Sequence, residues 1–187
     1  MKFAIADPPY LGRAKRWYGV GGIGKGYGIG QADQHPEAEK WDKPETHKNL
    51  IKHLDQNYDG FAIALTNHSL DIYLSEIKIG TATLYRVMAW VKPMSAPSAN
   101  RIRNAWEPVI IKTPEMRKGY TTKFARISDY LIESPPRNGF KGQKPKKWTY
   151  WVLDAMGVDK DDEIEDLFIG SGAVTQAIND YKKERLN

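Results

Sequence analysis

Short apolar runs alternate with segments of helical character along most of the chain. Runs typical of buried strands occupy residues 3–6, 61–65, 84–91, 109–111 and 164–169. Segments of helical character lie at 46–57, 70–77, 124–132, 148–156 and from 173 onward. This alternation predicts an α/β protein with a mainly parallel sheet, in which the strands end at a common edge.

The first apolar run ends in the tetrapeptide Asp7-Pro8-Pro9-Tyr10. Two prolines remove two backbone donors and fix two φ angles, so neither a strand nor a helix continues through them. The Asp7 carboxylate and the Pro8 carbonyl are two acceptors at a fixed separation, which suits them to grip both hydrogens of an NH2 group. Tyr10 offers a face on which an aromatic ring can stack. The tetrapeptide therefore favours methyl transfer to the exocyclic amine of a nucleobase. The alternative is a plain turn with a packed tyrosine.

The last apolar run leads through the turn Gly170-Ser171-Gly172 into the final predicted helix. Glycines let a ligand approach the backbone closely, and the N-terminus of a helix favours an anion. The turn is therefore a candidate cofactor site. An ordinary tight turn between strand and helix is the alternative.

Composition limits the class of protein. A chain of 187 residues with 41% hydrophobic and 27% charged residues is expected to form one globular domain. The sequence has no cysteine, which excludes disulfides and thiolate zinc sites. No apolar run is long enough to span a bilayer, and Asp7 interrupts the N-terminal apolar stretch where a signal peptide would need to continue. We therefore expect a cytoplasmic protein with no membrane contact.

The net charge of +5 is compatible with a polyanionic partner. Positive charges gather at 13–25 and 141–147 beside aromatic residues, as they often do on nucleic-acid-binding surfaces, although a solvated basic surface is the alternative. The glycine-rich run 19–30 lacks the hydroxyl residue of a P-loop and the preceding strand of a dinucleotide fingerprint. We expect it to be a loop that clamps or covers the site, or simply a flexible loop, and we expect the irregular basic segment 112–147 to contact the target.

The two motifs together resemble the S-adenosylmethionine-dependent amino methyltransferases that act on DNA. Asp7-Pro8-Pro9-Tyr10 looks like their catalytic motif, and residues 166–172, DLFIGSG, look like their cofactor motif. Lys144-Pro145 with Trp148 is similar to a third cofactor element of the family, and residues 106–110 resemble a weaker strand motif. The catalytic motif precedes the cofactor motif, which is the order of the circularly permuted branch.

The resemblance implies one Rossmann-like methyltransferase domain over residues 1–187, with S-adenosyl-L-methionine as cofactor, no metal, and DNA as partner in a bacterial or phage-infected cell. Asp7 to Tyr10 would hold a flipped-out adenine, since a leading Asp is the adenine-type form. Further substrate contacts are expected from Arg13, Lys25 and Asn67. The expected cofactor residues are Ala6, Asp7, Lys144, Trp148, Asp166, Phe168, Gly170, Ser171 and Gly172.

One departure from the family pattern affects cofactor binding. In the family, a further strand after the cofactor helix ends in an acid that binds the ribose, whereas this sequence stops after that helix. The sheet is therefore expected to have an open edge, which a second copy of the chain could cover as a homodimer. Three other functions remain as alternatives: methylation of RNA adenine, methylation of cytosine N4 in DNA, and nucleic-acid binding without catalysis.

Overall fold

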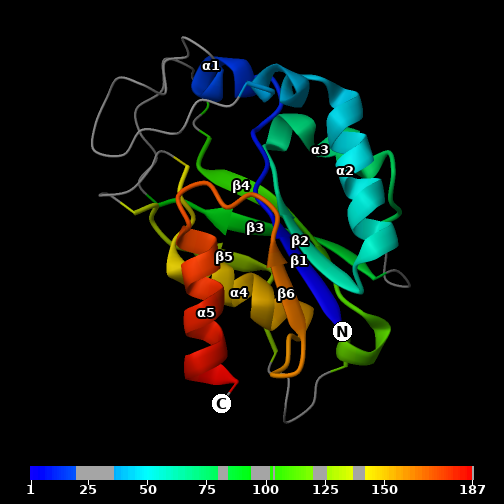
Figure 1. The fold of residues 1–187 in the computed structure, drawn as a ribbon, viewed down its shortest axis with the longest axis vertical. Helices are drawn as coiled ribbons and strands as arrows, with labels where there is room; N and C mark the ends of the chain where they lie inside the picture. The colour runs from blue at the N-terminus through cyan, green and yellow to red at the C-terminus, as the bar shows by residue number, and fades with distance from the viewer. Residues whose placement is uncertain are drawn as a thin grey trace.

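The computed structural model describes residues 1–19, 36–79, 84–93, 102, 104–119, 126–136 and 142–186. These residues form a six-stranded sheet with helices on both faces (Figure 1). The strand order is β5-β3-β4-β2-β1-β6. The strands are β1 (Lys2–Ala6), β2 (Gly60–Ala64), β3 (Tyr85–Val91), β4 (Trp106–Lys112), β5 (Tyr130–Ile132) and β6 (Glu163–Asp166).

The sheet is mixed. β1 runs parallel to β2 and to β6, and β3 runs parallel to β5. β4 lies between β2 and β3 and is antiparallel to both. The α/β class predicted from the sequence is confirmed, but the sheet is less dominated by parallel pairs than predicted. Because β4 is reversed, its first residues lie at the edge where β1, β2 and β3 end.

The helices form two layers. Helices α4 (Lys146–Met156) and α5 (Ala173–Arg185) pack on one face with Phe3 and Ile5 of β1. Helices α2 (Pro44–Asn57) and α3 (Leu70–Leu74) pack on the other face with Ala4 and Ala6. The short helices are α1 (Ala14–Tyr18), η2 (Ala38–Asp42), η3 (Asn67–Ser69) and η4 (Glu115–Arg117). The alternation of side chains along β1 thus fills a separate core on each face.

Most predicted elements are present, but several details differ from the prediction. Residues 130–132, which were assigned to a helix, form β5, because their backbone groups pair with those of β3. The helix after β2 ends at Leu74 rather than at residue 77. The residue before this helix, Ser69, does not cap it with its side chain, because the Ser69 hydroxyl donates to the Thr66 carbonyl at 3.0 Å. The segment 112–147 is also less irregular than predicted, because it contains η4 and β5.

Two local features hold the start of the chain in the sheet. Gly60 packs directly on β1: a Cβ atom there would lie 2.7 Å from the Phe3 ring and 2.9 Å from the Lys112 carbonyl oxygen. The Met1 amino group donates to Asp162 Oδ1 at 2.9 Å, and Arg117 Nη1 donates to Asp162 Oδ2 at 3.1 Å. Asp162 is buried, so this carboxylate joins the start of β1 to the turn that precedes β6.

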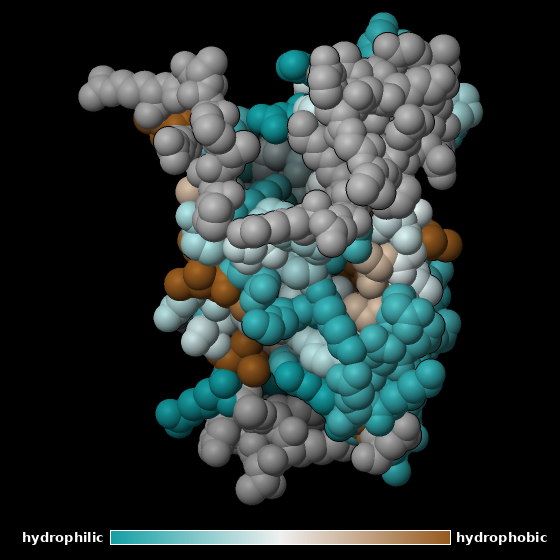
Figure 2. All heavy atoms as spheres, turned by 90° about the vertical axis from the view of Figure 1, so that its left-hand side faces the viewer, coloured by the Kyte–Doolittle hydropathy of each residue, from teal (hydrophilic) through white to brown (hydrophobic). Residues whose placement is uncertain are grey.

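The surface gives limited information about partners. Figure 2 shows the side that faces left in Figure 1, where the described residues are mainly hydrophilic and the hydrophobic ones form separate groups. Exposed large apolar residues include Tyr130 and Ile132 on the edge strand β5. Within the described ranges, no helix is both long enough and apolar enough to cross a membrane.

Candidate active site

The chemically active side chains meet at one edge of the sheet. Asp7 follows β1, Asn67 follows β2 and Lys92 follows β3, while the reversed strand β4 brings Glu107 to the same edge. β6 is the immediate neighbour of β1, with Ile5 opposite Asp166. The predicted catalytic tetrapeptide and the predicted cofactor turn therefore leave the sheet side by side, although they lie at opposite ends of the sequence.

Lys144 is the centre of the site. Its ammonium donates to Asp7 Oδ1 at 2.7 Å, to the Tyr10 hydroxyl at 3.0 Å and to the Gly142 carbonyl at 3.4 Å, so its three donors are all used. The Tyr10 hydroxyl in turn donates to Glu107 Oε2 at 2.8 Å. The Lys144 ammonium also lies 3.8 Å from that Glu107 oxygen.

Aromatic rings surround this cation. The Lys144 ammonium lies 5.4 Å from the centroid of Tyr10 and 5.6 Å from those of Trp90 and Trp148. The Lys144 side chain is only 2% exposed. A desolvated ammonium is stabilised by the faces of aromatic rings and by carboxylates, and both are present here.

Burial and charge together set the protonation of the cluster. Burial raises the pKa of Asp7, and the Lys144 ammonium offsets only part of this effect. Burial would lower the pKa of Lys144, but the carboxylates of Asp7 and Glu107 outweigh burial and hold this pKa above its usual value. Burial and the neighbouring carboxylates raise the pKa of Tyr10 well above its usual value. Lys144 is therefore a permanent cation, whereas Asp7 is a stronger base than an ordinary aspartate.

Two acceptors of the tetrapeptide have no donor among the described residues. Asp7 Oδ1 is engaged by Lys144, but Asp7 Oδ2 accepts no hydrogen bond from the part of the chain that the structure describes. The Pro8 carbonyl likewise has no donor among those residues. The Asp7 side chain is 21% exposed, so a ligand can reach it. These are the two acceptors that the sequence hypothesis assigns to the hydrogens of an amine.

The predicted cofactor turn is open. Gly170 and Gly172 have positive φ values of 48° and 76°, which favour glycine, and a Cβ atom on Gly172 would meet no atom within 4 Å. Asp166 braces the turn from below: its carboxylate accepts from the Phe168 backbone N–H at 3.2 Å and from the Thr175 hydroxyl at 2.6 Å. Since Gly170 and Ser171 are exposed, a ligand can approach the backbone and the N-terminus of α5.

The other predicted cofactor residues have different surroundings. Ala6 is fully buried in the core below the site, and Phe168 packs edge-on against Trp41 of η2 with ring centroids 5.1 Å apart. Trp148 is also fully buried, and its indole Nε1 has no hydrogen-bond partner among the described residues. Lys144, which was expected beside the cofactor, pairs with Asp7, which was expected to contact both the base and the cofactor.

The predicted substrate residues are not all placed. Arg13 is exposed at the start of α1, and Asn67 is exposed at the start of η3. Lys25 lies outside the described residues, as does the predicted loop 19–30 beyond Gly19.

Sequence reasoning missed three residues of the site: Lys92, Glu107 and Tyr18. Tyr18 lies on α1, whose first N–H groups, those of Ala14 and Lys15, are capped by the Asp42 carboxylate at 2.9 Å each. A Cβ atom on Gly142, whose carbonyl accepts from Lys144, would lie 3.9 Å from the Tyr18 hydroxyl, which places this residue beside the cluster. Burial and then the charge of Asp7 raise the pKa of the Tyr18 hydroxyl. Its place in the short helix that follows the tetrapeptide was the available signal.

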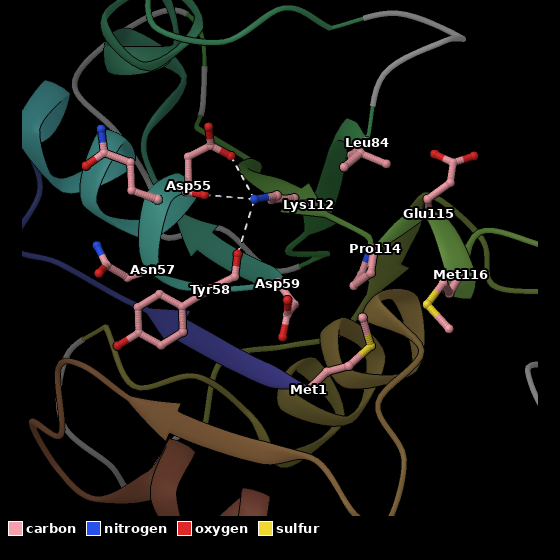
Figure 3. Close-up of a pocket in the computed structure, with 11 residues that line it drawn as sticks. Met1, Asp55, Asn57, Tyr58, Asp59, Leu84, Lys112, Pro114, Glu115 and Met116 are labelled. Atoms are coloured by element: carbon pink, nitrogen blue, oxygen red, sulfur yellow. Dashed lines mark hydrogen bonds and ion pairs between the residues drawn. The ribbon is translucent and has the colours of Figure 1, made fainter.

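A separate pocket lies at the opposite end of the strands (Figure 3). It encloses about 500 Å³. Its central cation, Lys112, points at Asp55 and Tyr58, where it donates to both backbone carbonyls at 3.0 and 3.2 Å and pairs with the Asp55 carboxylate at 2.8 Å. These partners use all its donors, so Lys112 braces the end of β4. The described residues also contain no cluster of side chains suited to a metal ion.

Comparisons with known proteins found solved structures with a similar α/β fold. No family model matches the chain, and a search of curated proteins found no match. The crystal structure of an M1.HpyAVI–SAM complex is similar over 97% of this chain and 78% of that chain, with a TM-score of 0.55 and 13% identity. A crystal structure of M1.HpyAVI is similar over 96% and 76%, with a TM-score of 0.50 and 13% identity. The two proteins share a fold. At this identity, the likeness extends to the fold alone.

Proposed function

We propose that this protein transfers a methyl group from S-adenosyl-L-methionine to the exocyclic amine of adenine in DNA. The observation that carries the proposal is the parallel pairing of β1 with β6, which sets the tetrapeptide Asp7 to Tyr10 beside the turn Gly170 to Gly172. A methyl acceptor held by the first and a methyl donor held by the second would lie next to each other. Proximity of this kind supplies much of the rate enhancement in a two-substrate reaction.

The tetrapeptide has the groups needed to hold the amine. Asp7 Oδ2 and the Pro8 carbonyl oxygen accept its two hydrogens, which makes the nitrogen lone pair more available for attack. The ring of Tyr10 supports the base by stacking, and the base must leave the duplex to reach this position. When the nitrogen gains a methyl group it loses one proton, and Asp7, whose pKa is raised by burial, accepts that proton.

The cofactor supplies an electrophilic methyl group on a positively charged sulfur. The open backbone at Gly172 and the N-terminus of α5 suit the carboxylate of its methionyl part, because α5 has no acidic residue in its first turn. Phe168 and Trp41 provide an aromatic corner beside the turn. The ring of Trp148 lies 5.6 Å from the Lys144 ammonium, and its buried Nε1 has no hydrogen-bond partner among the described residues. The fold match with a SAM complex supports this assignment.

Nucleic acid as the partner is supported by the surface next to the tetrapeptide. Arg13, Lys15 and Arg16 are exposed on or beside α1, which begins four residues after Tyr10. A phosphate backbone that enters the site from this side would meet a positive surface.

The proposal can be tested by incubating the protein with S-adenosylmethionine that carries a labelled methyl group. DNA and RNA are supplied as separate substrates, and their nucleosides are then analysed. We expect N6-methyladenine from DNA. Methylated adenine from RNA alone, or N4-methylcytosine, would replace the substrate assignment. Failure to methylate either nucleic acid, together with no heat of SAM binding in calorimetry, would overturn the enzymatic function.

Asp7→Ala tests the catalytic centre. We expect this variant to lose methylation while it keeps its circular dichroism spectrum, because the amine loses one of its two acceptors. Asp161→Ala is the matched control, since Asp161 is exposed in the turn before β6 and far from the tetrapeptide in the sheet. Methylation retained by Asp7→Ala would show that the reaction occurs elsewhere.

A further inference from the structure

Glu107 is a mostly buried carboxylate of the site to which the sequence motifs assign no role. It lies on β4 opposite Trp90 of β3. Its side chain is 17% exposed. A buried carboxylate at a binding edge needs partners for both oxygens, so its contacts show what it does.

Both oxygens of Glu107 have partners from different segments. Oε1 pairs with the ammonium of Lys92, which follows β3. Oε2 accepts the Tyr10 hydroxyl at 2.8 Å and lies 3.8 Å from the Lys144 ammonium. The Glu107 carboxylate is therefore held between Lys92 on one oxygen and Tyr10 and Lys144 on the other.

These contacts fix the ring of Tyr10. The backbone of the double-proline turn holds one end of the residue, and the hydroxyl at the other end lies between Lys144, from which it accepts, and Glu107, to which it donates. A phenol held at its hydroxyl cannot swing away from its place. The face that would support the target base is thus set before the base arrives.

Glu107 also balances part of the positive charge of the buried lysines. Lys92 and Lys144 carry two positive charges into the site, and Asp7 and Glu107 balance them with two negative charges. Without Glu107, Asp7 would be the remaining anion beside Lys144. Its second oxygen would then be drawn toward the ammonium instead of being available to an amine.

We propose that Glu107 is a positioning residue of the methyl-transfer site, which fixes the ring of Tyr10 and shares Lys144 with Asp7. This inference rests on the function proposed above. Glu107 acts through Tyr10 and Lys144, so it need not touch the base or the cofactor.

Glu107→Gln separates charge from shape, because the amide keeps an acceptor for Tyr10 but loses the negative charge. Glu115→Gln is the control, since Glu115 is 77% exposed on η4 and pairs with Lys118, three residues away. We expect kcat for DNA methylation to fall by about tenfold to a hundredfold in Glu107→Gln, the loss that a small misplacement of reacting groups produces. SAM affinity measured by calorimetry should be unchanged.

The pH profile distinguishes positioning from damaged packing. The Glu107 charge contributes to the raised pKa of Asp7, so its removal should move the acidic limb of the kcat profile to lower pH. Packing damage would lower the rate equally at every pH. The titratable groups that act on or are acted on by Asp7 are Lys144, Glu107, Asp166, Lys92, Tyr10, Tyr18 and Tyr73.

A second measurement does not depend on activity. In protein labelled with fluorotyrosine, the resonance that disappears in Tyr10→Phe belongs to Tyr10. We expect Glu107→Gln to shift or broaden this resonance and to leave those of distant tyrosines, such as Tyr181 on α5, in place. An unmoved Tyr10 resonance would overturn the positioning of Tyr10 by Glu107, whether or not the protein methylates DNA. An active wild type with an unchanged kcat and pH profile in Glu107→Gln would overturn the role in methyl transfer.

Discussion

Replacement of Lys144 by methionine removes the cation at the centre of the site and leaves its shape nearly intact. Methionine has a similar length, and its thioether suits a place among the rings of Tyr10, Trp90 and Trp148. The main change is that Asp7 loses the ammonium 2.7 Å from its Oδ1. We therefore expect the free energy of unfolding to fall, by an amount that depends on pH.

Protonation of Asp7 sets the size of this effect. Without Lys144, burial raises the pKa of Asp7 further above the value of the unfolded chain, which is about 3.9. A carboxyl group whose pKa is raised in the folded state does not destabilise the protein below the unfolded pKa, and it destabilises the protein increasingly as the pH rises above that value. The folded protein can avoid a buried charge by keeping Asp7 protonated, which costs about 1.4 kcal/mol per pH unit above 3.9. The loss in the free energy of unfolding is therefore limited to about 4 kcal/mol at pH 7 and about 1.5 kcal/mol at pH 5. We expect about 3 kcal/mol at pH 7, within the range for a broken buried pair.

Urea unfolding followed by circular dichroism at pH 7 and pH 5 measures the difference. Lys147→Met is the matched control, because Lys147 is 74% exposed and its pair with Glu133 lies at the surface. It should change stability by less than about 0.5 kcal/mol. The double variant Asp7→Asn/Lys144→Met removes both charges and should recover to within about 1 kcal/mol of the wild type.

Two results would refute this reasoning. The first is a loss in Lys144→Met that is the same at pH 5 as at pH 7, which would mean that packing rather than the Asp7 charge is responsible. The second is a double variant no more stable than Lys144→Met, since the buried charge of Asp7 would then not be the source of the instability.

Two further substitutions test the packing around β1 and β6. Gly60→Ala places a methyl group 2.7 Å from the Phe3 ring and should lower the free energy of unfolding in urea by about 1–3 kcal/mol. Gly119→Ala is the control, because its methyl group would meet no described atom within 4 Å. Equal effects of the two substitutions would contradict the close contact at Gly60. Asp162→Asn weakens the buried pair with Arg117 and should lower the free energy of unfolding by about 2 kcal/mol, as measured by calorimetry. A loss below about 0.5 kcal/mol would mean that the pair is dispensable.

The sequence predicted those parts of the fold that depend on local pattern. The apolar runs located β1, β2 and β4, because a strand buried on both faces needs consecutive apolar residues. They also located β3 and β6, which are only partly buried. Residues 130–132 were misassigned, because β5 owes its conformation to pairing with Ala89 to Val91, more than thirty residues away. The reversed direction of β4 was missed for the same reason, since an apolar run carries no sign of its direction.

The site was predicted in its motifs but not in its partners. Asp7 to Tyr10 could be identified, because two consecutive prolines after a strand have few structural explanations. Lys144 was predicted as a cofactor residue, but its ion pair with Asp7 was not predicted. Lys92 and Glu107 were assigned no role, because they reach the site only through the antiparallel pairing of β3 and β4. Charges that meet across a sheet edge are a tertiary property.

The proposed reaction explains why a second carboxylate, that of Glu107, lies beside Lys144. While Asp7 is ionised, it is the main counter-ion of Lys144, at 2.7 Å, with Glu107 at 3.8 Å. When Asp7 accepts the proton that the amine loses, it can no longer neutralise the buried ammonium. Glu107 is then the anion left beside Lys144, and the Lys144 and Lys92 ammoniums hold its own pKa below the usual value, so it stays charged while Asp7 changes state. One carboxylate free to take a proton and another kept ionised let a buried lysine hold the site together throughout the reaction.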